Sequence, residues 1–222
     1  MPMRNINMKR LLNYMGQMQL NTKLLLGFGF VLLIALLIGS RSMYDTAKMD
    51  KAMQQLYEKD LLGVSHIKEA NVHFVEIGRS LRHMALATYP EQREAAKKRL
   101  EEARTTLQKE LNEGRERIFR EENKKLLAEF DLLYTQYLRK VDHAINLLEV
   151  DKSAYRDLAV QYLLGADFSA TGDKADNKLS ELSRSKEKGA QEAAIEASNQ
   201  YRRHLYLSIT LLFAGLIGGA IF

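Results

Sequence analysis

Two arginines on one predicted helix face are the residues of this sequence best suited to bind an anion. Arg79 and Arg82 lie next to His83, in a row whose other members, spaced at three and four residues, are apolar: Val72, Val75 and Leu86. Because guanidinium groups bind carboxylates bidentately, two of them about a helical turn apart can hold an anionic ligand. We therefore expect Arg79, Arg82 and His83 to bind a small organic acid or amino acid. The alternative is that the arginines are solvated or pair with a carboxylate such as Glu76.

A second set of candidate ligand contacts lies later in the chain. Four tyrosines occupy predicted inward helix positions: Tyr134, Tyr137, Tyr155 and Tyr162. Because buried phenols need hydrogen-bond partners, Tyr137 and Tyr162 are expected to line a polar pocket that accepts the ligand. Gln161, at a comparable depth on its helix, is expected to meet a ligand held by Arg79. The alternative for the tyrosines is core packing with their hydroxyl groups reaching water.

Other chemistries have little support in the sequence. His66 and His73 share a helix face at seven-residue spacing, whereas helical metal sites use closer pairs or Glu-x-x-His. The chain has no cysteine, which excludes thiol catalysis, and no Ser-His-Asp arrangement or Gly-rich phosphate loop. We expect no enzymatic activity, no cofactor and no metal.

Two uncharged segments, residues 24–40 and 205–222, are each about long enough to cross a bilayer as a helix. The net charge of +5 is concentrated before the first of them, because residues 1–23 contain basic residues and no acid. By the positive-inside tendency, residues 1–23 form a cytoplasmic segment, and 24–40 and 205–222 are transmembrane helices. No Ala-x-Ala site follows residue 40, which favours an uncleaved anchor over a signal peptide. The basic excess thus reflects membrane topology and gives no reason to expect a nucleic-acid partner.

Residues 41–204 are predicted to form helices throughout, because apolar residues recur at three and four. The first seam is Ile67, Ala70, Phe74, Ile77, Leu81, Met84 and Thr88. A break at Thr88–Glu91 follows, where Pro90 suits the first helical turn and Thr88 with Glu91 has capping-box spacing. Two shorter helices come next, with apolar seams predicted from Ala96 to Ile118 and from Leu127 to Leu148. A fourth helix begins at residues 151–153. Its predicted inward residues are Tyr155, Leu158, Tyr162, Gly165, Phe168, Leu179 and Leu182, with fraying expected near Gly172.

These lengths predict an all-α protein, an antiparallel up-down-up-down four-helix bundle whose two long helices are continuous with the transmembrane helices. Residues 41–204 then lie outside the membrane, on the side opposite to residues 1–23.

The chain resembles the four-helix-bundle sensor module of bacterial methyl-accepting chemotaxis receptors. The similarity rests on the basic start, the opening of the first span at residues 23–30, the long helix after it, the single break at Tyr89–Pro90 and the second span from Leu205. It implies that residues 41–204 are a periplasmic ligand-binding domain of a protein of the bacterial inner membrane. It also implies a homodimer that binds a small anionic solute and passes a helix shift through the second span. In such receptors, arginines on this helix bind the ligand carboxylate across the dimer interface, a few turns below the outer tip. Arg79 has a matching depth, roughly 13 Å below Thr88 at 1.5 Å per residue.

The resemblance also implies that a full-length receptor acts through a cytoplasmic coupling protein and a histidine kinase. The family's output parts have no counterpart before Phe222, so we expect an N-terminal fragment or a truncated product. Two alternatives remain open from the sequence. The same module can belong to a histidine kinase or nucleotide cyclase, or the chain can be a ligandless structural coiled-coil membrane protein.

Overall fold

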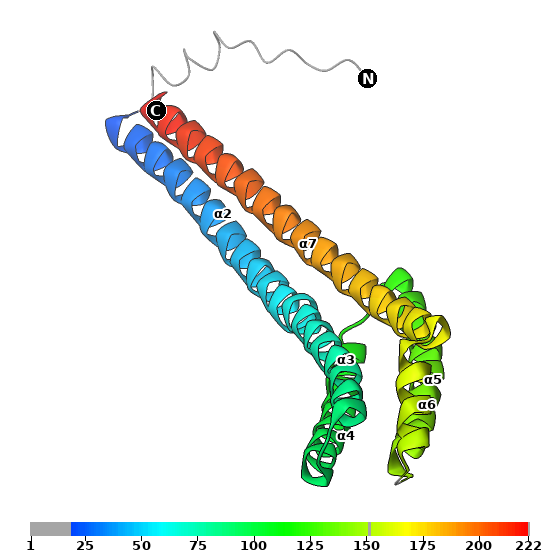
Figure 1. The fold of residues 1–222 in the computed structure, drawn as a ribbon. Helices are drawn as coiled ribbons and strands as arrows, with labels where there is room; N and C mark the ends of the chain where they lie inside the picture. The colour runs from blue at the N-terminus through cyan, green and yellow to red at the C-terminus, as the bar shows by residue number, and fades with distance from the viewer. Residues whose placement is uncertain (1–18, 151, 222) are drawn as a thin grey trace, which may run out of the picture. The chain divides into compact units, whose positions relative to one another are not determined.

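Helices account for nearly all of the computed structural model, which describes residues 19–150 and 152–221 (Figure 1). Most of the predicted segment 1–23, the cap residue Asp151 and the end of the predicted span 205–222 lie outside the described residues. In chain order the elements are α2 Leu20–Gln55, the π-helical turn η1 Leu56–Leu61, α3 Leu62–Leu86, α4 Pro90–Arg115, α5 Glu121–Glu149, α6 Ser153–Leu164 and α7 Ala166–Ile221. The predicted all-α four-helix bundle is confirmed.

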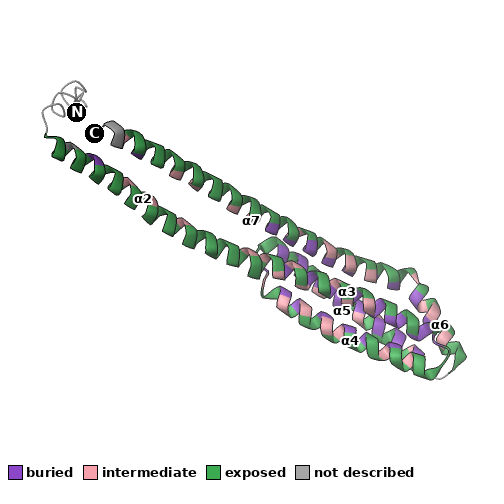
Figure 2. Ribbon diagram, turned by 90° about the vertical axis from the view of Figure 1, so that its left-hand side faces the viewer, coloured by how far each residue is buried: buried purple, intermediate pink, exposed green. Residues whose placement is uncertain are grey.

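The chain divides into two compact units. The bundle unit is Gln54–Ala194, and it contains α3, α4, α5, α6 and the first half of α7. The paired-helix unit consists of the described parts of Met1–Met53 and Ile195–Phe222, which belong to α2 and the second half of α7. Figure 2 shows that the buried residues gather in the bundle unit, while α2 is almost entirely exposed.

In the paired-helix unit, α2 and α7 contact each other through polar and small residues. His204 Nδ1 lies 2.9 Å from Asp45 Oδ2. Gly215 allows close packing, because a Cβ there would lie 3.1 Å from Cγ2 of Ile34. Among the described residues, one helical segment, Leu20–Leu86, is long and apolar enough to cross a membrane by length and composition.

The seam predicted for the first helix is the core of the bundle unit. Ile67, Ala70, Phe74, Ile77, Leu81 and Met84 are all buried. The remaining core comes from the predicted seams of α4 and α5, including Leu100 and Phe130, and from α6 and α7, including Leu163, Leu179 and Leu182. Apolar residues at three- and four-residue intervals therefore hold the four helices together, as heptad packing requires.

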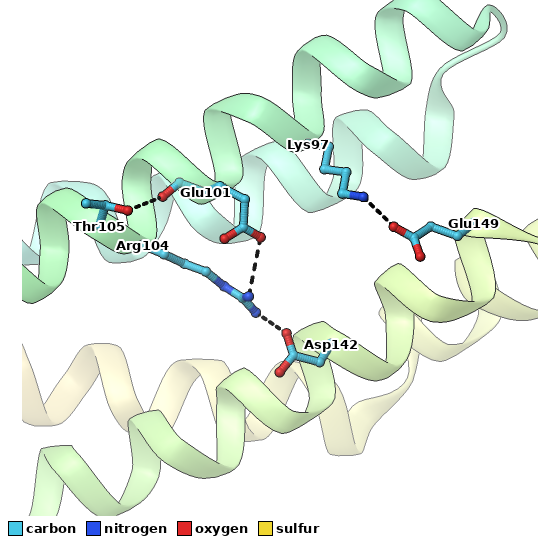
Figure 3. Close-up of polar contacts among 6 residues, drawn as sticks. All are labelled: Lys97, Glu101, Arg104, Thr105, Asp142 and Glu149. Atoms are coloured by element: carbon cyan, nitrogen blue, oxygen red, sulfur yellow. Dashed lines mark hydrogen bonds and ion pairs between the residues drawn. The ribbon is translucent and has the colours of Figure 1, made fainter.

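Ion pairs between side chains tie α4 to α5 outside this core (Figure 3). Lys97 pairs with Glu149, and Arg104 lies between Glu101 of its own helix and Asp142 of α5. The hydroxyl of Thr105 donates to the backbone carbonyl of Glu101 at 2.9 Å. Partly exposed pairs of this kind add little stability each, so they align helices that the apolar core already holds.

The break between the first two bundle helices differs in detail from the prediction. Helix α3 ends at Leu86, Ala87 is extended, and Thr88 is exposed rather than part of the seam. The N-cap of α4 is Tyr89, which makes no side-chain cap hydrogen bond, so the predicted Thr88 capping box is wrong. Pro90 does lie in the first turn of α4, where its missing N–H costs nothing.

The predicted fourth helix is two helices. It breaks at Gly165, whose ψ of 141° is extended, and not at Gly172. Gly172 lies within α7, against the ring of Tyr137, where a Cβ would be 3.2 Å from Cε2. The break shifts the helical phase, so Tyr155 and Leu158, predicted to face inward, are 38% and 51% exposed. Ala159 and Leu163 are buried in their place.

Aromatic rings from three helices fill the centre of the bundle unit. Tyr137 contacts Phe74 with ring centroids 4.9 Å apart and Phe168 at 5.5 Å, and Tyr134 stacks on Phe130 at 5.5 Å. Burial raises the pKa of both Tyr134 and Tyr137 to about 12, against a smaller opposing effect of nearby arginine. Such ring pairs stabilise the fold by more than the burial of their apolar surface alone provides.

Replacing Phe130 with Ala is expected to reduce the free energy of unfolding by about 3–5 kcal/mol, because it leaves a cavity under two rings. Leu132→Ala is the matched control on the same helix, since Leu132 is 67% exposed. That control is expected to change stability by less than about 0.5 kcal/mol. Urea unfolding of the full chain in detergent, followed by circular dichroism, measures both. Equal losses in the two variants would contradict the position of the core.

Alkaline pH is expected to destabilise the bundle unit through Tyr134 and Tyr137. Each phenol titrates near pH 10 when unfolded and near pH 12 when folded, so its contribution is complete below pH 10 and is lost as the pH rises towards 12. The loss is about 2 kcal/mol for each tyrosine by the upper end of this range. Tyr134→Phe and Tyr137→Phe should each flatten the dependence of unfolding free energy on pH, whereas Tyr89→Phe, at an exposed position, should not. An unchanged slope in the first two variants would contradict the burial of their hydroxyl groups.

Candidate functional site

The arginine row, Val72, Val75, Arg79, Arg82 and Leu86, lies on the exposed face of α3. The seam of the same helix faces the core, so the side chains of the row are exposed. Three exposed apolar side chains next to two guanidinium groups form a surface that is both apolar and cationic. Contiguous exposed apolar side chains often mark a contact surface, so we expect a partner to cover the apolar part of the row.

Arg79 already has a carboxylate partner. Its Nη1 donates to Oε2 of Glu76 at 2.9 Å, and the other oxygen of Glu76 accepts from the hydroxyl of Ser80 at 3.3 Å. The alternative interpretation of Arg79, a pair with Glu76, is therefore what the structure contains. The Arg79 side chain is 60% exposed, so this pair is a weak one that a ligand carboxylate can replace.

Arg82 is different, because no carboxylate among the described residues lies within ion-pair distance of it. It lies instead near the hydroxyl of Tyr137, and its charge partly offsets the effect of burial on the pKa of that phenol. Gly78 makes this possible: a Cβ there would lie 3.0 Å from Tyr137 Oη and 3.6 Å from Arg82 Nη1. A phenol of α5 thus reaches the arginine row through the gap that Gly78 leaves in α3.

The sequence did not single out Gly78, although a signal was present. A glycine inside a helix costs about 1 kcal/mol relative to alanine, so its presence between Ile77 and Arg79 needs a reason. Close approach of a side chain from another helix is such a reason. Of the predicted ligand-binding residues, Arg82 and Tyr137 lie near each other, and Arg79 lies three residues before Arg82 on the same face of α3.

Tyr162 lies apart from the arginine row. Its half-buried ring makes edge contacts with His143 at 4.9 Å and with Phe168 at 5.8 Å between centroids. It is connected to Tyr137 only through Phe168, which both rings contact. Gln161 is exposed on α6. The predicted meeting of Gln161 with a ligand at Arg79 stays a prediction.

His83 points towards α4. It lines a surface hollow of about 320 Å³ between the end of α3 and the start of α4, together with Leu86, Gln92 and Arg99. His83 and Arg99 therefore line the same hollow at the end of the bundle unit. A ligand that contacts both Arg82 and His83 has to extend around α3.

The two histidines that share a helix face bind different carboxylates. His66 Nδ1 lies 2.7 Å from Glu110 of α4, and His73 Nε2 lies 3.5 Å from Glu69 of its own helix. Within residues 19–150 and 152–221, no group of three or more His, Cys, Asp or Glu side chains is placed to hold a metal ion. His66 and His73 therefore each contact a single carboxylate and do not share a ligand.

Comparison with known families supports this organisation. A family model described as a four helix bundle sensory module for signal transduction matches residues 17–201, most of the chain. No curated protein and no solved structure matches the sequence significantly. The match includes every helix of the bundle unit, together with α2 and most of α7. The chain therefore belongs to the family of four-helix-bundle sensory modules for signal transduction.

Proposed function

We propose that this chain is the sensor region of a transmembrane chemotaxis receptor that binds a small organic acid or amino acid at Arg82 and Arg79. The family supports a sensor of the chemoreceptor type. The observation that supports an anionic ligand is the exposed arginine row, in which Arg82 has no carboxylate partner among the described residues and lies near the phenol of Tyr137.

Arg82 is the main contact in this proposal. It has no carboxylate partner among the described residues, so a ligand meets no competing anion there. The phenol of Tyr137 supplies a neutral donor next to it. Arg79 contributes after exchanging Glu76 for the ligand, and that exchange is easy because an exposed pair is worth at most about 1 kcal/mol.

A second copy of the chain completes the site. Val72, Val75 and Leu86 are exposed apolar residues on the arginine row, and covering them needs an apolar partner surface. The same row on a second copy is such a surface, and an isologous dimer places it there by symmetry. In this arrangement each ligand lies between arginines of two copies of α3.

Signalling in this proposal follows the helices into the membrane. Residues 1–23 are cytoplasmic, 24–40 and 205–222 are the two transmembrane helices of the inner membrane, and 41–204 form the periplasmic domain. Helix α7 is continuous from Ala166 to Ile221, so a shift at its start can be transmitted along its length. Shifts of about 1–2 Å are a known way of switching. In the full-length receptor the output passes to the cytoplasmic coupling protein and histidine kinase.

Arg82→Ala is expected to weaken binding of the preferred acid by about 10- to 100-fold, because hydrogen bonds to charged groups are worth about 1.5–3 kcal/mol. Isothermal titration of the full chain in detergent with succinate, malate, citrate, aspartate and glutamate identifies that acid. Arg79→Ala should have a smaller effect because Arg79 is shared with Glu76. Arg139→Ala is the matched control, an exposed arginine on α5. Undiminished binding of the same acid by Arg82→Ala would overturn the site.

Val75→Lys is expected to weaken dimerisation at least about tenfold, because it buries an unpaired ammonium next to the arginines of the proposed contact. Leu132→Lys, which charges another exposed apolar position, on α5, should leave the dimer unchanged. Sedimentation equilibrium in density-matched detergent measures both dissociation constants. If the two variants dimerise equally well, α3 is not the dimer surface.

A further inference from the structure

Lys186 of α7 is a lysine inside the bundle unit, only 4% exposed. Its ammonium donates to the carbonyl of Arg117 at 2.8 Å and lies 3.5 Å from the carbonyl of Lys59. No carboxylate in the described part of the chain lies within ion-pair distance of it. A charge buried with backbone carbonyls alone is costly, so the site is short of one negative charge.

Two glycines make room for cations at this place. A Cβ on Gly63 would lie 2.6 Å from Cε of Lys186, and a Cβ on Gly189 would lie 2.8 Å from Cζ of Arg120. Arg120 rests on α7 and donates to the carbonyl of Gly189 at 3.3 Å and to Glu192 at 3.1 Å. Lys186 and Arg120 thus lie close to the same stretch of α7. Burial lowers the pKa of Lys186, and the charge of Arg120 lowers it further, whereas the carboxylate of Asp60 raises it.

Both cations line a hollow of about 250 Å³, which we call the lysine hollow. Its other main lining residues are Gln55, Asp60, Phe119 and Asn123. Drug-sized ligands occupy roughly 300–1,000 Å³, so the lysine hollow suits a smaller molecule or ion. Asn123 is buried and its Oδ1 accepts from Ser185 at 2.6 Å, which leaves its amide N–H groups as donors.

We propose that the lysine hollow binds a small oxyanion, a carboxylate or phosphate group, between Lys186, Arg120 and Asn123. Such a group supplies the negative charge that the buried ammonium lacks and accepts hydrogen bonds from all three side chains. Phe119 provides an apolar wall, whose ring also lies 4.7 Å from the Lys59 ammonium. Asp60 is the single acid among the lining residues, and its repulsion limits the affinity.

The site involves the one π-helical turn of the described chain. Asp60 and the carbonyl of Lys59 belong to η1, while Lys186 and Gly189 belong to α7. Single π-helical turns inside α-helices are frequent at functional sites. An oxyanion that draws Lys186 towards itself weakens the long contact with Lys59, so its binding acts on both η1 and α7. This site is separate from the arginine row and does not depend on the function proposed for it.

The test is isothermal titration of the full chain in detergent with inorganic phosphate and with acetate, against sodium chloride of equal ionic strength. At least one of the two anions is expected to bind the wild type. Lys186→Met should weaken that binding by about tenfold or more, because it removes a charged donor. Asp60→Asn should strengthen it by about threefold or more, because it removes the repelling charge. Lys188→Met, an exposed lysine two residues further on, is the matched control and should bind as the wild type does.

The opposite directions of the two main variants keep the proposal testable. If Lys186→Met loses helicity by circular dichroism, the anion affinity of Asp60→Asn still tests the proposal. Binding by Asp60→Asn that is unchanged or weaker than that of the wild type overturns it. Absence of binding by either anion to the wild type also overturns it. Arg82→Ala separates the two sites: binding that is lost in Arg82→Ala but kept in Lys186→Met belongs to the arginine row and excludes the lysine hollow.

Discussion

The burial of one apolar seam on α3 is the constraint on which the rest of the bundle unit depends. Because the chain has no cysteine, no disulfide links its helices, and apolar packing is what mainly holds them together. Once Ile67, Phe74 and Leu81 face the core, helical geometry requires residues on the opposite side of the same turns to face outward. The exposure of Arg79 and Arg82 therefore follows from the core. The row also contains apolar side chains that the core does not use, and these need a partner.

Much of this arrangement could be predicted from the sequence, because three- and four-residue spacing carries the phase of a helix. The seams of α3, α4 and α5 and the position of Pro90 were predicted correctly for that reason. The phase of the fourth helix was wrong before Gly165, because a single extended residue rotates everything on one side of it. Spacing alone does not reveal such a break when apolar residues are dense on both sides.

The lysine hollow was missed because residues 183–204 are rich in charged and small residues, the composition of a solvated helix. A signal was nevertheless present. Leu179, Leu182 and Lys186 follow one another at three and four residues, so Lys186 occupies a core position of the seam. Its partners cannot be found this way, because they are backbone carbonyls of Arg117 and Lys59, far away in the sequence. Side-chain types do not indicate which carbonyls a turn leaves free.

The arginine row and the lysine hollow differ in how strongly solvent screens their charges. Arg79 and Arg82 lie in water, where their charges are screened and a ligand gains affinity only when a covering surface removes that water. Lys186 is already removed from water, so its charge acts at lower dielectric and any oxyanion beside it interacts more strongly. Desolvation also lowers the pKa of the ammonium, which makes the site responsive to the nearest charges, Asp60 and Arg120. An anion at the proposed site on α3 would therefore gain affinity from a covering surface, whereas an anion in the proposed lysine hollow would gain it from the low dielectric around Lys186.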